Sequence, residues 1–189
     1  QKLLNCVLMM DDYTISLDPE TEMVCTLYLF KDVQNSNELH KKVMDNKLSC
    51  CIIKAALIVD PLQVIVAANK AAISAKMAQL TTKTLYTEVL FNLSISKNIS
   101  RSLAKFGVSD NDKNILIAII HKECDGYSMS EILMNSIKGE RVLISSLPQF
   151  TDFDLVKKTY RIDENELNIS TFTNSVISRI SCKDFILLK

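Results

Sequence analysis

Two short apolar runs, at residues 24–31 and 114–121, constrain the fold of this chain more than any other feature. Both are rich in β-branched, aliphatic or aromatic side chains, and their length is typical of buried strands. The run at 114–121 is the most apolar short stretch of the sequence, so we expect it to be a central strand. A sheet built on such strands must be covered by helices, and the remaining sequence carries helical patterns.

Apolar spacing and capping residues predict those helices. Asp60 followed by Pro61 is a strong start signal, because Asp caps the free N–H groups of the first turn and Pro fits the first helical position. Gly107 stands where a left-handed residue would end a short helix that begins after Asn98. The expected helices are 38–46, 61–78, 84–94, 99–106, one near 129–138, 152–160 and 164–181, with a further strand at 141–145.

These elements predict an α/β (or α+β) protein with a small central mixed sheet flanked by several helices. A length of 189 residues suits one domain, which we expect over 23–189. Residues 1–22 form an acidic polar lead-in that we expect to be partly ordered. No apolar run approaches the 18 residues of a membrane span, so no membrane association is expected.

Glycine is scarce, and its scarcity excludes two classes of nucleotide site. The chain holds three glycines, Gly107, Gly126 and Gly139. A G-x-G-x-x-G fingerprint or a Walker loop needs closely spaced glycines, because a side chain would keep the backbone N–H groups away from phosphate. No two glycines of this chain lie close enough to form either loop.

The residues that carry most enzyme chemistry are also few. There are two histidines, His40 and His121, no G-x-S-x-G motif, and no clustered set of metal ligands. Six cysteines occur without a C-x-x-C pair, so we expect free thiols in a reducing compartment. We therefore predict no catalytic residue, no resident metal and no cofactor.

Basic charge is concentrated in one stretch of an otherwise neutral chain. Lys plus Arg and Asp plus Glu both number 22, but residues 69–105 hold one acid, Glu88, against six bases. Two interpretations remain open at this point: solvated helix faces, or a patch that faces phosphate. The six bases are Lys70, Lys76, Lys83, Lys97, Arg101 and Lys105.

The expected last helix carries an apolar stripe, and apolar residues continue beyond it at 185–188. Such a stripe belongs either to the core or to an interface with another protein. The stripe consists of Leu167, Phe172, Val176, Ile177 and Ile180.

The middle of the chain resembles the TPRKB family, the PRPK-binding subunits of the KEOPS complex. The resemblance rests on an ordered series of blocks from about residue 24 to residue 185, each of them weak alone. The longest is IVDPLQVIVAANKA at 58–71; the others include LFKDV at 29–33, FNLS at 91–94, NIS at 98–100 and KFGVS at 105–109.

This resemblance implies a non-catalytic subunit that binds the N-terminal lobe of PRPK, a small atypical kinase and ATPase. It also implies a part in the threonylcarbamoyladenosine modification of tRNA, contact with the tRNA 3′ CCA end, and location in cytoplasm and nucleus. We expect the kinase contact at Phe172, Val176, Ile177 and Ile180, with Lys183 and Asp184 as a polar rim. Candidates for tRNA contact are Asn69, Lys70, Lys83, Thr84, Phe106 and Gly107.

Two alternatives remain open. The chain could be a tRNA-binding protein whose RNA contact is its main contribution, or a diverged paralogue with a different partner. An enzyme in its own right is disfavoured by the missing glycine loops and metal ligands.

Overall fold

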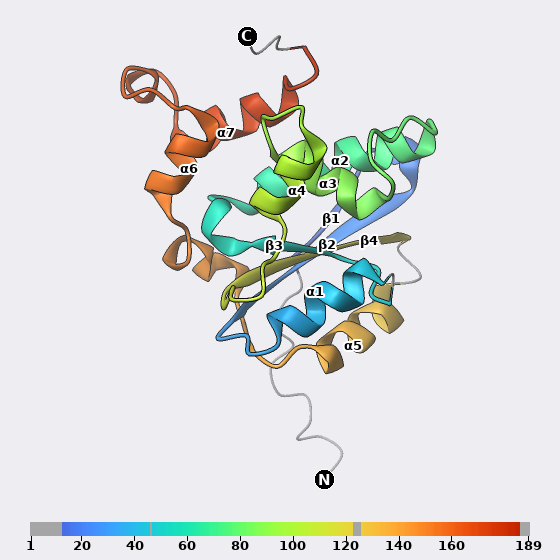
Figure 1. The fold of residues 1–189 in the computed structure, drawn as a ribbon. Helices are drawn as coiled ribbons and strands as arrows, with labels where there is room; N and C mark the ends of the chain where they lie inside the picture. The colour runs from blue at the N-terminus through green and yellow to red at the C-terminus, as the bar shows by residue number, and fades with distance from the viewer. Residues whose placement is uncertain (1–12, 46, 123–125, 186–189) are drawn as a thin grey trace, which may run out of the picture.

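The computed structural model describes residues 13–45, 47–122 and 126–185. Within them, five strands form one sheet with helices on both faces (Figure 1). The strand order is β1-β2-β4-β3, and β5 pairs with β2 beside β1. The strands are β1 (Tyr13–Ser16), β2 (Met23–Lys31), β3 (Cys51–Lys54), β4 (Ile115–Lys122) and β5 (Glu140–Val142).

The two predicted strands are the central pair of this sheet. Strand β2 pairs with β4 over eight residues, with Leu27 opposite Ala118. The combination of one sheet with several helices confirms the α/β class. Every pair of described strands is antiparallel, so the expectation of a mixed sheet is wrong. The strand directions could not be predicted from the sequence. The connection from β3 to β4 contains three helices, and a connection of that length can enter the next strand from either end of the sheet.

Helices cover the two faces of the sheet unequally (Figure 1). One face is covered by α1 (Ser36–Met44) and α5 (Gly126–Ser136). The other carries the remaining helices: α2 (Pro61–Lys76), α3 (Leu85–Leu93), α4 (Ile99–Phe106), α6 (Phe153–Tyr160) and α7 (Phe172–Ser181). Short 3-10 turns lie in the connections between strands and helices: η1 (Pro19–Thr21), η2 (Ala55–Leu57), η4 (Ile144–Gln149) and η5 (Glu166–Asn168).

Strand β4 is apolar from Ile115 to Ile120 because this part of it is buried on both faces. Its alternate side chains point to opposite sides of the sheet. Leu116, Ala118 and Ile120 join the core under α2, α3 and α7, whereas Ile115 and Ile117 join the core under α1 and α5. One sheet thus separates two hydrophobic cores, and both stabilise it.

Three predicted helix starts are confirmed at the level of hydrogen bonds. The Asp60 carboxylate accepts from the Leu62 N–H at 2.8 Å, and the Asn98 amide oxygen accepts from the Arg101 N–H at 2.9 Å. Thr84 and Thr87 form a capping box at the start of α3. Each cap satisfies N–H groups that have no partner inside the helix.

Three details differ from the sequence predictions. Gly107 is extended, with φ −68° and ψ 152°, and is needed instead for close packing, since a Cβ there would lie 2.7 Å from the Leu103 carbonyl oxygen. The last helix begins at residue 172 rather than 164, because Thr171 caps it by accepting from the Asn174 N–H. The strand expected at 141–145 is shorter, because β5 ends at Val142 and a 3-10 turn begins at Ile144.

The acidic lead-in contributes strand β1, and Asp18 caps the turn η1. Residues 1–12 of the lead-in, residue 46 of the expected first helix, and 186–189 of the apolar end lie outside the described residues. Cys25, Cys50 and Cys51 are free and buried, and Cys182 is free and exposed; Cys6 and Cys124 lie outside the description. Among the described helices, none has the length and hydropathy to cross a bilayer.

Candidate functional site

A hollow of about 430 Å³ opens between α4, the segment before it and the C-terminal end of α6. We call it the basic hollow, because five of the nine residues that line it are Lys or Arg and none is acidic. Its lining consists of Ser94, Ile95, Ser96, Lys97, Arg101, Lys105, Lys158, Thr159 and Arg161.

The positive charge of the basic hollow comes from two helices. Arg101 and Lys105 stand four residues apart on one face of α4, and Lys97 lies just before the Asn98 cap of the same helix. Lys158 and Arg161 approach the same space from the end of α6. None of the five side chains forms an ion pair with another described residue. Like charges at this spacing repel, and an anion bound between them would relieve that repulsion.

The single acid of the basic stretch does not neutralise this surface. Glu88 is buried, and its carboxylate accepts from the N–H and the hydroxyl of Thr82, both at 2.7 Å. These bonds stabilise the turn that leads into α3, and Glu88 does not line the basic hollow.

A second hollow of about 440 Å³ adjoins the first. Ile95 and Arg161 line both, and Arg179, Cys182 and Lys183 line the second hollow only. Arg161 therefore stands on the wall that the two hollows share. Arg161 thus extends the positive charge of the basic hollow toward the second hollow, where Arg179 is paired with Glu166 and Lys183 is buried.

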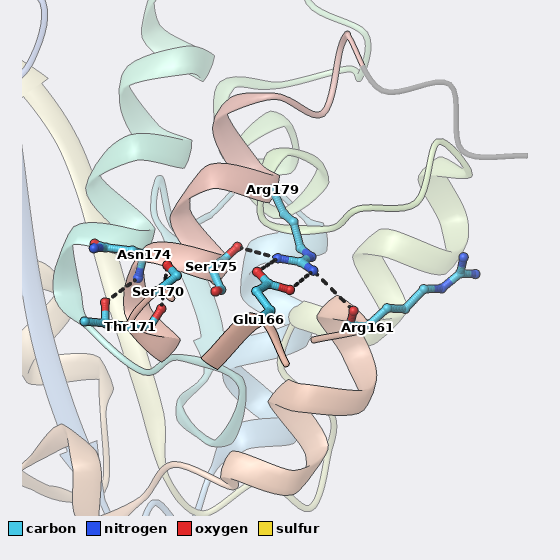
Figure 2. Close-up of polar contacts among 7 residues, drawn as sticks. All are labelled: Arg161, Glu166, Ser170, Thr171, Asn174, Ser175 and Arg179. Atoms are coloured by element: carbon cyan, nitrogen blue, oxygen red, sulfur yellow. Dashed lines mark hydrogen bonds and ion pairs between the residues drawn. The ribbon is translucent and has the colours of Figure 1, made fainter. Parts of the chain in front are cut away.

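An ion pair lies behind this wall (Figure 2). Arg179 donates to both carboxylate oxygens of Glu166 at 2.6 Å, to the Ser175 carbonyl at 3.0 Å and to the Arg161 carbonyl at 3.2 Å. These bonds from Arg179 lower the pKa of Glu166 to about 2. The pair is thus charged at all physiological pH values and joins η5 to α7 and to the end of α6.

Most residues predicted to contact tRNA lie elsewhere and have structural roles. Phe106 is fully buried, so its ring offers no face for base stacking, and that prediction is wrong. Asn69 accepts from the Asp18 N–H at 2.6 Å, and Lys70 donates to the Ile180 carbonyl and pairs with Asp184. Gly107 bridges to Ile53 beside the sheet edge.

Lys83 and Thr84 are exposed, although neither lines the basic hollow. Three of the hollow's bases belong to the basic stretch noted in the sequence, and the four-residue spacing of Arg101 and Lys105 was the signal that these two share a helix face. Lys158 and Arg161 come from a distant segment, so no local pattern could have assigned them to the site.

Some of the residues predicted to bind the kinase are buried, and others are exposed. Val176 and Ile180 are fully buried in the core beneath α7, so the structure contradicts an interface role for them. Lys183 is 4% exposed; its Nζ donates to the Phe91 carbonyl and lies 3.1 Å from the centre of the Phe91 ring. An apolar stripe on a helix is compatible with burial in the core and with binding a partner. In this protein Val176 and Ile180 of the stripe are buried in the core.

Phe172 remains partly exposed and belongs to an apolar surface that the sequence did not reveal. Its ring contacts Phe153 of α6 edge to face, with the ring centres 5.8 Å apart. Phe153 is 49% exposed, and Ile169, just before α7, is 89% exposed. We call Phe153, Ile169 and Phe172 the apolar ridge. Exposed aromatic and aliphatic side chains grouped in this way are typical of protein interfaces.

Ile177 and Asp184 were also predicted to contact the kinase. Ile177 is partly buried and Asp184 is exposed.

The two histidines have local structural contacts. His121 lies 3.0 Å from the Thr26 hydroxyl through Nε2 and 2.7 Å from the Lys122 carbonyl through Nδ1. His40 lies 3.5 Å from Asp110 at the surface. The described residues contain no group of three side chains that could hold a metal ion.

Comparison with known proteins identifies the family. The model of the family described as "Kinase binding protein CGI-121" matches residues 30–184. The chain belongs to the CGI-121 family. The TPRKB resemblance is thereby confirmed, because the EKC/KEOPS complex subunit TPRKB of Danio rerio is 32% identical over 163 residues, covering 86% of this chain and 93% of that protein.

Fungal members of the CGI-121 family are also similar. The EKC/KEOPS complex subunit cgi121 of Schizosaccharomyces pombe is 27% identical over 157 residues, covering 81% of this chain and 89% of its own. The Candida glabrata subunit CGI121 is 24% identical over 162 residues, with coverage of 85% and 90%. The family match includes both hollows and the apolar ridge.

Proposed function

We propose that this chain is a non-catalytic subunit of an EKC/KEOPS assembly that binds a PRPK-type kinase and supports threonylcarbamoyladenosine modification of tRNA. The observation that carries the proposal is membership of a family described as kinase-binding, whose relatives are named as EKC/KEOPS subunits. Free thiols support a location in cytoplasm and nucleus, where cysteines stay reduced.

The apolar ridge is the surface that we propose for the kinase. It replaces the expected stripe, of which Val176 and Ile180 are needed inside the core. Binding a partner there would remove the exposed parts of Phe153 and Ile169 from water, which is the main favourable contribution in stable protein association.

Co-purification of the chain with a PRPK-type kinase tests this surface. Ile169→Asp is expected to abolish recovery of the complex, because a carboxylate would be buried unpaired at the interface. Ile132→Asp is the matched control: Ile132 is 63% exposed, but it lies on α5 across the sheet, so recovery should be unchanged. Loss with both variants, or with neither, would contradict an interface at the apolar ridge.

A second candidate function is contact with RNA phosphates in the basic hollow. It is favoured by five basic side chains around one hollow, none of which forms an ion pair with a described acid, and by the lack of an acid in the hollow's lining. An RNA contact of this kind must weaken steeply as salt rises, because bound phosphates release counterions.

The assay for the RNA contact is the salt dependence of binding between the full chain and a labelled tRNA transcript. Arg101→Ala should lower the affinity and reduce the slope of log affinity against log salt by about one. Lys41→Ala on α1 is the control, because it removes an equal charge from the far side of the sheet. Binding that does not respond to salt, or equal losses with both variants, would refute the RNA contact at this hollow.

A further inference from the structure

Arg161 has a backbone conformation that its side chain disfavours. It ends α6 in the left-handed region, with φ 54° and ψ 50°, where glycine is the usual residue. An L-residue with a long side chain is strained there, so surrounding contacts must hold the turn. The conformation also aims the Arg161 side chain away from the Glu166–Arg179 pair, as Figure 2 shows.

Two sets of contacts hold the turn. At the C-terminal end of α6, the backbone N–H groups of Arg161 and Ile162 both donate to the Lys157 carbonyl. From outside, the Arg161 carbonyl accepts from Arg179, and Arg179 is itself oriented by the two oxygens of Glu166 (Figure 2). When a carboxylate binds two nitrogens of a planar guanidinium, the direction of the remaining N–H groups is fixed. One of those N–H groups of Arg179 donates to the Arg161 carbonyl.

We propose that Glu166 is a positioning residue for anion binding: through Arg179 it fixes the left-handed turn that places the Arg161 guanidinium on the wall shared by the two hollows. The inference rests on the proposed RNA contact and deepens it. Glu166 itself lines neither hollow, so its effect must pass through Arg179.

The sign of one mutational effect distinguishes positioning from plain electrostatics. Glu166→Gln removes a negative charge near the basic hollow, so electrostatics alone predicts tighter tRNA binding. Positioning predicts weaker binding, because a glutamine amide has one acceptor oxygen where the carboxylate has two, and its NH₂ group cannot accept from the second guanidinium nitrogen. We expect the Kd for a labelled tRNA transcript to rise about threefold to tenfold.

Glu164→Gln is the matched control. Glu164 lies in the same connection between α6 and α7 and pairs with Lys157, but it has no bond to Arg179 or Arg161. Its substitution changes the net charge equally, so the Kd should stay unchanged or fall by up to about twofold. Weaker binding by Glu166→Gln with no weakening by Glu164→Gln supports the inference.

A further variant conserves the net charge and allows the fold to be checked separately from tRNA binding. Arg179→Lys keeps the charge but cannot bind Glu166 and the Arg161 carbonyl together, because an ammonium group lacks the planar fork. We expect it to weaken tRNA binding to the same extent as Glu166→Gln, with an unchanged far-UV circular dichroism spectrum.

Arg161→Gly supplies the background in which a positioning role must vanish. Glycine accepts the left-handed turn, so the chain should fold normally while losing the phosphate contact. Glu166→Gln added to this variant should then cause no further loss of tRNA affinity. A further loss would reveal general loosening and would overturn the inference.

Failure of the inference and failure of the RNA contact give different results. If wild-type binding depends on salt and Arg101→Ala weakens it, but Glu166→Gln binds as tightly as Glu164→Gln, the positioning role alone is refuted. If wild-type binding does not depend on salt, the RNA contact is refuted and the positioning role falls with it.

Discussion

Replacing Lys183 by methionine is expected to stabilise the folded chain at neutral pH. Burial lowers the pKa of Lys183 to about 8 from an ordinary value of 10.5, so the folded state holds its charged form at a cost. That difference corresponds to about 3 kcal/mol, an upper bound on the stabilisation that removal of the charge can give. The partner carbonyl of Phe91 still accepts from the Ser94 N–H at 3.2 Å, so methionine leaves no bare acceptor.

The expected gain at pH 7 is about 1 to 3 kcal/mol, because methionine also forfeits the lysine's contact with the Phe91 ring. The gain must depend on pH. Between pH 8 and 10.5 the unfolded wild type binds more protons than the folded one, so wild-type stability rises relative to that of the variant. The advantage of Lys183→Met should therefore shrink across this window and vanish near pH 10.5.

Urea unfolding of the two proteins at pH 7, 9 and 10.5 measures this difference directly, since contributions from other titrating groups cancel. Destabilisation by more than about 1 kcal/mol at pH 7 would refute the reasoning, because it would make the buried charge net favourable. So would a difference that stays constant with pH. Lys183→Met should also bind the kinase normally, since the side chain lies beneath the surface.

Other predictions concern stability and can be checked by the same unfolding measurements. Tyr160→Phe should cost about 1 to 3 kcal/mol, because the buried hydroxyl donates to the Leu93 carbonyl at 2.6 Å and accepts from Gln63 at 2.9 Å; no loss would mean that water reaches these groups. Asp60→Ala should cost about 1 kcal/mol through loss of the α2 cap, and an unchanged midpoint would contradict that role. Burial raises the thiol pKa values of Cys25 and Cys50 to about 12 from an ordinary value of 9.0, so above pH 9 the unfolded chain loses these protons while the folded chain keeps them. Each thiol should therefore lower the free energy of unfolding by about 1.4 kcal/mol per pH unit above pH 9. A free energy of unfolding that stays constant up to pH 11 would refute this.

The elements of this fold were largely predictable because their signals are local. The strand at 24–31, the central strand at 114–121 and the capped start at Asp60 each depend on neighbours within a few residues. The direction of the strands was not predictable, because it depends on long connections. Gly107 illustrates a related ambiguity: a glycine after a helix can serve a left-handed turn or a close approach, and only packing decides between them.

The sites were less predictable for a physical reason. The stripe that contains Val176 and Ile180 marks a face that must be covered, but it does not say whether the chain itself or a partner covers it. Phe106 has the aromatic ring that base stacking requires, but tertiary packing buries that ring completely. The basic hollow joins Arg101 of α4 to Lys158 and Arg161 of α6, and that meeting exists only after the chain has folded.

The most direct test of the proposed function is the affinity of this chain for a PRPK-type kinase at low and high salt. A contact through the apolar ridge should change its Kd by less than about threefold between 0.1 and 0.5 M salt, because hydrophobic burial is not screened by ions. Ile169→Asp should remove the binding at both concentrations. A Kd that rises more than tenfold with salt while Ile169→Asp binds normally would contradict the account, because it would show that the kinase binds through the basic surface instead.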